Sequence, residues 1–306
     1  MKRGLSRAID AALFAGVAFG LALYGRRYIP GALDSLSRLS AWRMAVCCLL
    51  ALSGYILRFS MWQSMAGSFG LRASPTSGAR AFFVSFLGRY VPGNVGLMLA
   101  RMRAYGSHPS GVVALATAAE YAALAASALF LVSFEAGVWA SAGIQPAVWP
   151  LGATALILAL LHPFVLRRAS GFAWRMFRRS PPSDFPSWGR MASCTAGYAL
   201  NGVLNGTALF MVLRGMIDLP CSLLPLVISR YYIAGLAGGV AAFAPAGLGI
   251  REGVLVASLA GISGAEPALA AALVMRLVTV SLELLLAGAS VLAAGGARRD
   301  QGRRAA

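Results

Sequence analysis

The chain has 306 residues, of which 58% are hydrophobic and only 12% are charged, and its mean hydropathy is +0.72. Soluble domains carry about 25% charged residues, so this composition excludes an ordinary soluble domain and indicates an integral membrane protein. The net charge of +17 would suggest nucleic-acid binding in a soluble protein, but the arginines lie mainly between apolar runs, where orientation in a membrane is the better explanation.

Six apolar runs of about 20 residues predict membrane-spanning helices. In chain order they cover residues 6–25, 44–66, 111–134, 147–166, 191–213 and 268–294. Two further apolar stretches are interrupted: residues 81–100 at Val91-Pro92-Gly93-Asn94, and residues 222–264 at Ala244-Pro245-Ala246-Gly247. Because proline followed by glycine stops a helix and permits a reversal, we expect each stretch to form a re-entrant helical hairpin that returns to the side it came from.

The basic residues predict the orientation. A cytoplasmic N-terminus places most of the 27 Lys and Arg residues, Arg101 and Arg103 among them, on the cytoplasmic side, as the positive-inside rule requires. Those left outside are Arg26, Arg27, Arg38, Arg43 and Arg214, and those at membrane depth are Arg58, Arg89, Arg230, Arg251 and Arg276. Both termini are thus expected in the cytoplasm, at a bacterial-type inner membrane. If residues 81–100 form one full span instead, the cluster at residues 26–43 moves inside and the N-terminus outside, at nearly the same agreement with the rule.

The order of spans and hairpins predicts an all-α membrane protein with an inverted-topology repeat. Residues 1–306 form a single transmembrane domain with half-repeats at about 1–140 and 141–297 and a basic tail at 298–306. Each half has two spans, a hairpin and a third span, and the two hairpins enter from opposite sides. Transporters commonly have such repeats, and their broken helices meet at the substrate site.

Ionisable side chains at membrane depth are costly, so they usually pair, face a cavity and serve a function. Several stand beside the two breaks, and Arg276 and Glu283 lie two helical turns apart on one face of the last span. The candidate substrate-binding residues are Arg89, Tyr90, Pro92, Gly93, Asn94, Arg101, Glu120, Pro245, Gly247, Gly249, Arg251, Glu252, Arg276 and Glu283.

This set predicts a buried polar cavity in which arginines hold an anionic group, because the planar guanidinium donates two parallel hydrogen bonds to a phosphate. Helix N-termini after the two breaks would add backbone N–H groups to the same anion. The alternative is that Glu120, Glu252 and Glu283 only neutralise the arginines as structural pairs.

The sequence also suggests structural roles for residues mostly outside this candidate set. Arg58 either reaches towards an interface or faces the core, whereas Arg230 is expected to anchor at the lipid headgroups. The Gly202-x-x-x-Gly206 and Gly249-x-x-x-Gly253 motifs predict close packing of helices. No G-x-S-x-G, H-E-x-x-H or P-loop motif is found in the sequence, and its four cysteines and two histidines have no metal-site spacing. We therefore expect no cofactor and no metal.

Two segments resemble a known family. Phe86-Leu87-Gly88-Arg89-Tyr90-Val91-Pro92-Gly93-Asn94-Val95-Gly96, with Arg101 and Glu120 after it, is similar to the first signature of the lysylphosphatidylglycerol synthase transmembrane region family. Pro245-Ala246-Gly247-Leu248-Gly249-Ile250-Arg251-Glu252-Gly253, with Arg276 and Glu283 after it, is similar to the second and more specific signature. The resemblance covers roughly residues 10–294.

The resemblance implies an inner-membrane protein that binds or translocates polar-headed lipids, with the two hairpins framing the cavity. The family's two-part proteins also carry a soluble aminoacyl-transferase domain, and the residues after Ala294 are too few to form one. Synthesis of lysylphosphatidylglycerol by this chain alone is therefore not expected.

The leading hypothesis is translocation of an anionic or aminoacylated phospholipid, or of a related glycolipid, by a flippase or scramblase mechanism. The expected partners are membrane lipids with anionic headgroups, together with a second copy of the chain or a lipid-synthesis enzyme, and no nucleic acid. One alternative is a membrane-embedded enzyme that modifies a lipid or polyprenyl-linked substrate, with Glu120 or Glu252 as general base. A second is an accessory subunit of an envelope-lipid pathway.

Overall fold

The computed structural model describes residues 33–90, 95–106, 108–141, 149–176, 182, 184–241 and 244–305, and all their regular elements are helices. The expected first span, residues 6–25, lies outside these residues, as do Pro92, Gly93 and Asn94. The helices are α2 (Ala41–Ser68), α3 (Pro75–Leu87), α4 (Val95–Ala104), α5 (Ser110–Ser141), α6 (Trp149–Leu160), α7 (Pro163–Met176), α8 (Trp188–Met216), α9 (Leu224–Val240), α10 (Ile250–Ser263) and α11 (Ala265–Ala305), with 3₁₀ turns η1 (Gly88–Tyr90), η2 (Cys221–Leu223) and η3 (Pro245–Gly247).

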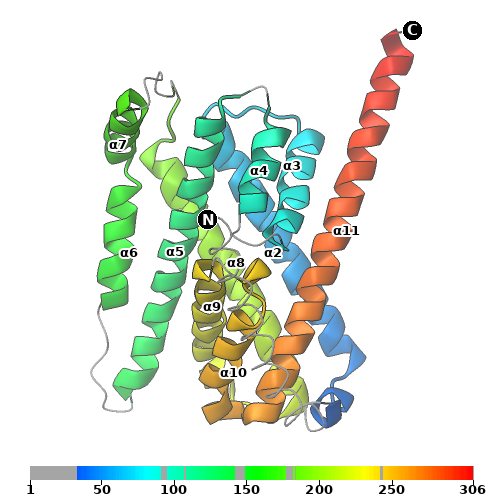
Figure 1. Cartoon of the computed structure of the whole chain (residues 1–306). Coiled ribbons are helices and arrows are strands. Elements are labelled where there is room, and N and C mark those ends of the chain that lie inside the picture. Colours follow the sequence, from blue (N-terminus) through cyan, green and yellow to red (C-terminus); the bar gives the residue numbers. More distant parts are fainter. Residues whose placement is uncertain are drawn as a thin grey trace, which may run out of the picture.

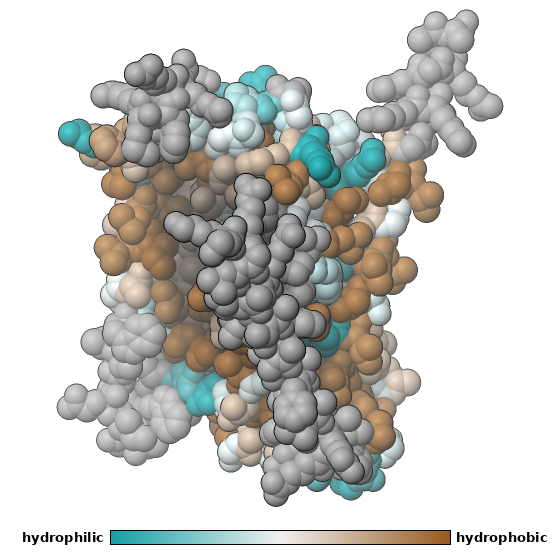
Figure 2. All heavy atoms as spheres, viewed as in Figure 1, coloured by the Kyte–Doolittle hydropathy of each residue, from teal (hydrophilic) through white to brown (hydrophobic). Residues whose placement is uncertain are grey.

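Within the described residues, five helices are long and apolar enough to cross a membrane, and the bent pair α6–α7 would make a sixth. Four of them, α2, α5, α8 and α11, cover four of the five spans expected from residue 44 onward, and the fifth helix, Cys221–Val240, includes α9 of the second interrupted stretch. Hydrophobic surface runs along the flanks of the molecule, and large apolar side chains such as Leu277 and Leu292 lie on the outside (Figure 2). These features confirm the prediction of an all-α, multi-pass membrane protein.

The span expected at residues 147–166 differs from the structure. Helix α6 ends at Leu160, and α7 begins at Pro163 after a bend of 63°. Pro163 has no N–H group to continue the helix and disfavours a helical conformation at the residue before it. His162 caps the N-terminus of α7, because its Nδ1 atom accepts a hydrogen bond from the Phe164 N–H group at 3.3 Å.

Both interrupted stretches fold back on themselves. Helices α3 and α4, which flank the first break in the sequence, pack against each other, and so do α9 and α10, which flank the second. Residues 81–100 are therefore not one continuous helix. In Figure 1 the pair α3–α4 occupies the upper half of the bundle and α9–α10 the lower half, and η1, the last described turn before the first break, contacts η3 of the second.

Glycines make both reversals tight. A Cβ atom on Gly88 would lie 2.5 Å from the backbone of Gly96 in the first hairpin, and one on Gly247 would lie 2.7 Å from the Cα atom of Gly238 in the second. The second break also has left-handed backbone at Ala246 (φ 51°), Gly247 (φ 66°) and Gly249 (φ 85°), a conformation that glycine adopts without strain.

A helix from each half of the chain packs against the hairpin of the other half. Helices α2 and α8 pack together, α11 packs against α3 of the first hairpin, and α5 packs against α9 of the second. Gly202 and Gly206 of α8 allow close packing as expected, because Tyr232 and Ile228 of α9 lie directly on them. Gly253 does not, since no atom lies within 4 Å of a Cβ placed there.

Candidate functional site

A cavity of about 400 Å³ opens where the two hairpins meet, a volume within the range of about 300–1,000 Å³ that ligand pockets usually have. Its walls come from both hairpins and from α2, α5, α8 and α11. The polar residues that line it are Tyr55, Arg58, Arg89, Tyr121, Asn201, Asn205, Tyr231, Tyr232, Arg251, Thr279 and Glu283. A polar chamber between apolar helices is the arrangement that buried ionisable groups require.

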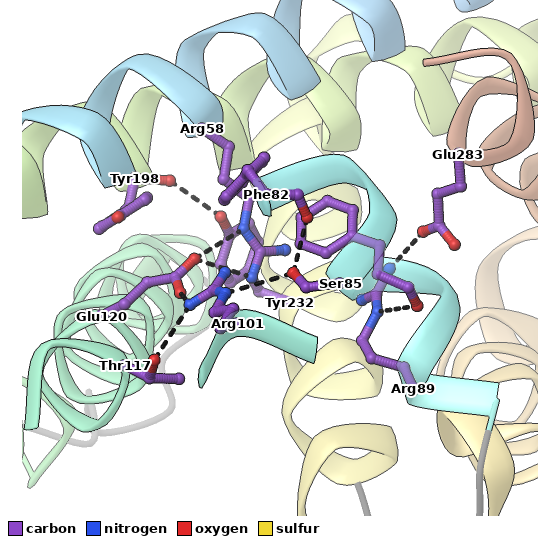
Figure 3. A network of polar contacts seen from close by, with 11 residues as sticks. Arg58, Phe82, Ser85, Arg89, Arg101, Thr117, Glu120, Tyr198, Tyr232 and Glu283 are labelled. Atoms are coloured by element: carbon purple, nitrogen blue, oxygen red, sulfur yellow. Dashed lines mark hydrogen bonds and ion pairs between the residues drawn. The ribbon is translucent and has the colours of Figure 1, made fainter. Parts of the chain in front are cut away.

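On one wall, Arg89 of η1 pairs with Glu283 of α11 (Figure 3). The same carboxylate accepts hydrogen bonds from the Tyr55 hydroxyl at 2.6 Å and from the Tyr90 hydroxyl at 3.1 Å. The Arg89 guanidinium also lies 4.4 Å from the centre of the Phe86 ring. This network ties the tip of the first hairpin to the last helix, although the two segments are nearly 200 residues apart in the sequence.

On the facing hairpin, Arg251 of α10 lines the cavity with its guanidinium 4.8 Å from the centre of the Tyr231 ring. Within the described residues it forms no ion pair with a carboxylate. A desolvated cation held on an aromatic face keeps its charge and its hydrogen-bond donors available. Arg251 can therefore receive an anionic group that enters the cavity.

Glu120 of α5 lies behind the cavity wall and is fully buried. It accepts from Arg58 at 3.3 Å and from Arg101 at 2.5 Å (Figure 3). Arg101 is fully buried too, with its guanidinium 3.8 Å from the centre of the Trp62 ring. Arg101, which the sequence analysis counted on the cytoplasmic side, is therefore buried within the protein, where it pairs with Glu120.

Beside the main cavity, Arg276 of α11 pairs with Glu252 at 3.5 Å and donates to the Ala246 carbonyl at 3.4 Å. Glu252 also accepts from the Gly249 N–H group at 2.7 Å, which caps α10. One of the N–H groups that the sequence analysis expected to bind an anion at this break is therefore already occupied. The Nη2 atom of Arg276 is buried without a hydrogen-bond partner in the described part of the chain.

Arg230 was expected to anchor at lipid headgroups, and the structure corrects this. Its Nη2 atom pairs with Glu135 of α5 at 2.5 Å, and its Nη1 atom donates to the Ser258 carbonyl at 2.8 Å. Ser229 also donates to Glu135, at 2.7 Å. Arg230 turns inward because Glu135, which the sequence analysis did not consider, offers a charged partner within reach.

The sequence analysis also missed the uncharged polar wall. Asn201 and Asn205 of α8 line the cavity beside Tyr232 of α9. The Asn205 Nδ2 atom donates to the Asn201 carbonyl at 2.9 Å and to Asn201 Oδ1 at 3.0 Å. The available signal was the pair of amides four residues apart on one face of an otherwise apolar span.

The predicted site residues thus fall into groups. Arg89, Arg251 and Glu283 line the main cavity, Tyr90 contacts Glu283, and Arg276 and Glu252 line a small void beside it. The remaining members are the buried pair Arg101 and Glu120, the backbone break at Pro245, Gly247 and Gly249, and Pro92, Gly93 and Asn94, which lie outside the described residues.

The charges of this region do not balance. Arginines 58, 89, 101, 251 and 276 face only three glutamates, Glu120, Glu252 and Glu283, among the described residues. An excess of two positive charges among largely buried side chains favours an anion strongly.

Comparison with known proteins identifies the family. The family model described as the lysylphosphatidylglycerol synthase TM region matches residues 9–287, which include both hairpins and every described residue of the cavity. No curated protein matches the chain. Since the match covers most of the chain, this protein belongs to the lysylphosphatidylglycerol synthase TM region family.

Proposed function

We propose that the protein translocates polar-headed lipids between the two leaflets of its membrane, with the headgroup passing through the central cavity. Membership of the family gives the chain a membrane lipid-related function. The observation that carries the finer proposal is Arg251, a guanidinium that lines the cavity without a carboxylate partner in the described residues. An anionic phosphate is the complement of that group.

In this proposal the headgroup leaves water and enters the cavity while the acyl chains stay in lipid. Arg251 binds the phosphate first, and Arg58 and Arg89 add positive potential from the other walls. The low dielectric of the site strengthens each of these interactions. Removing the hydration of a phosphate is the main barrier to spontaneous flipping, and the arginines replace that hydration.

The two hairpins would act as gates on opposite sides of the membrane. Helices α3 and α4 have 13 and 10 residues, so at 1.5 Å per residue each covers about 15–20 Å of a core about 30 Å thick. Their entry from the end of the bundle opposite to α9–α10, and the reciprocal packing of α5 and α11, support re-entrant hairpins in an inverted repeat. Movement of one hairpin away from the other would open the cavity to one side at a time.

Reconstitution tests the proposal. Purified full-length protein in liposomes should raise the transbilayer rate of a fluorescently labelled anionic phospholipid above that of protein-free liposomes, as followed by chemical quenching of the outer leaflet. Arg251→Gln should reduce the added rate at least about tenfold, the effect of losing a charged hydrogen bond. Arg72→Gln, which removes an exposed arginine away from the cavity, is the matched control. Rates at the protein-free baseline for every phospholipid tried would refute translocation.

Lipid analysis of a deletion strain separates transport from catalysis. Translocation predicts an unchanged set of lipid species with an altered distribution between leaflets. The loss of one species would instead support a lipid-modifying enzyme. The structure provides one argument against Glu120 as the base of such an enzyme, because two arginines occupy its carboxylate and it does not line the cavity.

A further inference from the structure

We infer that the cavity selects a phosphodiester headgroup that carries hydroxyl groups and rejects headgroups that carry an ammonium group. The inference rests on the proposed function and narrows it to a class of lipid. It depends on three observations: the carboxylates of the site already pair with arginines, Arg251 has no carboxylate partner among the described residues, and the other polar side chains that line the cavity at Asn201 and Asn205 are uncharged.

The carboxylate that lines the cavity has no charge left for a ligand. Glu283 is paired with Arg89, and hydroxyl groups of Tyr55 and Tyr90 donate to its two oxygens. An ammonium group would have to displace Arg89 from this network, which would leave a buried guanidinium without a partner.

The other two carboxylates are engaged in the same way. Glu120 accepts from Arg58 and Arg101 behind the wall, and Glu252 accepts from Arg276 and from the backbone N–H group that caps α10. An ammonium headgroup in the cavity would therefore meet the positive ends of Arg58 and Arg251 with no compensating anion among the described residues. Repulsion between the ammonium group and these two guanidinium groups, in an environment of low dielectric constant, opposes binding.

The uncharged wall offers a complement to hydroxyl groups. Asn205 uses its Nδ2 atom on Asn201, and within the described chain its Oδ1 atom makes no hydrogen bond. An amide oxygen accepts from a hydroxyl, and neighbouring amide and phenol groups can donate to it. Tyr121 and Tyr232 add aromatic surface on the same chamber.

The position of the two amides is built into the helix contact. Gly54 of α2 lies against them, and a Cβ atom there would come within 2.5 Å of Asn205 Nδ2 and 2.8 Å of Asn201 Oδ1. The cavity thus combines a cationic wall at Arg251 with a neutral hydrogen-bonding wall at Asn201 and Asn205. A phosphate esterified to a polyol, such as glycerol or a sugar alcohol, satisfies both walls.

Binding of short-chain lipids to the purified full-length protein tests this assignment. The probes are phosphatidylglycerol, phosphatidylethanol, phosphatidylethanolamine and lysylphosphatidylglycerol with identical acyl chains. Phosphatidylethanol has the phosphodiester charge without hydroxyls or amine, so it is the reference. We expect phosphatidylglycerol to bind about 3- to 10-fold more tightly than this reference, the effect of one or two neutral hydrogen bonds. Both amine-bearing lipids should bind at least tenfold more weakly than phosphatidylglycerol.

Variants separate the two walls. Asn205→Leu should lower the affinity for phosphatidylglycerol to that for phosphatidylethanol, and Arg251→Gln should weaken both lipids together. Asn205→Asp should raise the affinity for lysylphosphatidylglycerol, because it adds a carboxylate to the cavity. This gain cannot come from misfolding.

Several outcomes would overturn the inference. Equal binding of phosphatidylethanol and phosphatidylglycerol would refute the hydroxyl wall, and tight binding of either amine-bearing lipid would refute the exclusion of ammonium. Tight binding of soluble glycerophosphoglycerol would show that the ligand is a free phosphodiester and not a lipid. If no lipid binds, the proposed function fails as well, whereas selective binding without transbilayer movement refutes translocation alone.

Discussion

Single residues at the centre of this protein show how a membrane helix bundle holds charge on buried side chains. Arg101 has no exposed surface, lies 3.8 Å from the centre of the Trp62 ring and shares Glu120 with Arg58. Its Nε atom also donates to Ser85 at 3.3 Å. Burial of such a guanidinium is tolerated because its charge is matched by an anion and an aromatic face.

Removal of the Glu120 charge tests that dependence. Glu120→Gln should lower the free energy of unfolding in detergent by about 3–5 kcal/mol, because the buried Arg101 loses its counter-charge. The measurement is a denaturation titration of the purified protein. Glu266→Gln, in the exposed first turn of α11, is the control and should change stability by no more than about 0.5 kcal/mol. A Glu120→Gln protein as stable as this control would show that the pair is not needed for folding.

At the scale of elements, the second hairpin depends on backbone that only small residues permit. Gly247 has φ 66°, and its Cα atom packs on Gly238. The break is also held from outside, since Arg276 donates to the carbonyl of Ala246, which lies in the left-handed region at φ 51°. The hairpin tip is therefore a fixed structure that presents Arg251 to the cavity.

Alanine at two glycines of this hairpin should have opposite effects. Gly247→Ala combines left-handed strain with a Cβ atom 2.7 Å from Gly238, and should cost about 2–4 kcal/mol of stability. Gly253→Ala has open space around the added Cβ atom, and should stabilise α10 by about 0.5–1 kcal/mol. Thermal denaturation of the two variants beside the wild type checks both signs. Equal effects would mean that the tight reversal does not form.

The pair Arg230 and Glu135 ties α9 to α5, and the bond from Arg230 to Ser258 extends the tie to α10. A double-mutant cycle with Glu135→Gln and Arg230→Gln should give a coupling energy of about 0.5–3 kcal/mol, as residues in one network do. The control cycle combines Glu135→Gln with Arg38→Gln, which changes an exposed pair at the end of the bundle. Additive effects in the first cycle would contradict the tie.

At the scale of the whole molecule, the basic side chains divide unequally between the two ends of the bundle. Exposed arginines 72, 80, 103, 167, 168 and 190 lie on segments at the upper end in Figure 1, whereas the exposed arginines 38 and 214 and the half-buried Arg43 lie on segments at the lower end. The positive-inside rule therefore predicts that the upper end faces the cytoplasm.

Thiol labelling checks this orientation with a natural probe. Cys221 is exposed in η2, and α8 runs to the lower end of the bundle just before this turn, so a membrane-impermeant maleimide should label it in intact cells. A cysteine introduced as Arg72→Cys in a Cys221→Ser background should react only after the membrane is permeabilised. The reverse pattern would invert the topology, and labelling of both sites in intact cells would contradict a fixed orientation.

The sequence by itself predicted four of the helices that are long enough to cross the membrane, α2, α5, α8 and α11, and the two apolar stretches that are interrupted. The length of an apolar run decides whether its helix can cross the membrane, because a helix rises 1.5 Å per residue. A proline closely followed by glycine stops a helix. The family was also readable, since its signatures are contiguous around Arg89 and Arg251. All of these are local properties of the chain.

Only the tertiary structure decided which charges meet. Arg230 pairs with a glutamate 95 positions away, Arg101 turns inward to Glu120, and Asn201 and Asn205 reach the cavity because α8 faces α2 across Gly54. Partner choice in a bundle depends on which face of each helix is turned towards its neighbour, and packing sets that rotation. Arg251 forms no ion pair with a described carboxylate for the same reason: the tightly reversed second hairpin places its guanidinium over the Tyr231 ring, while the neighbouring Glu252 pairs with Arg276.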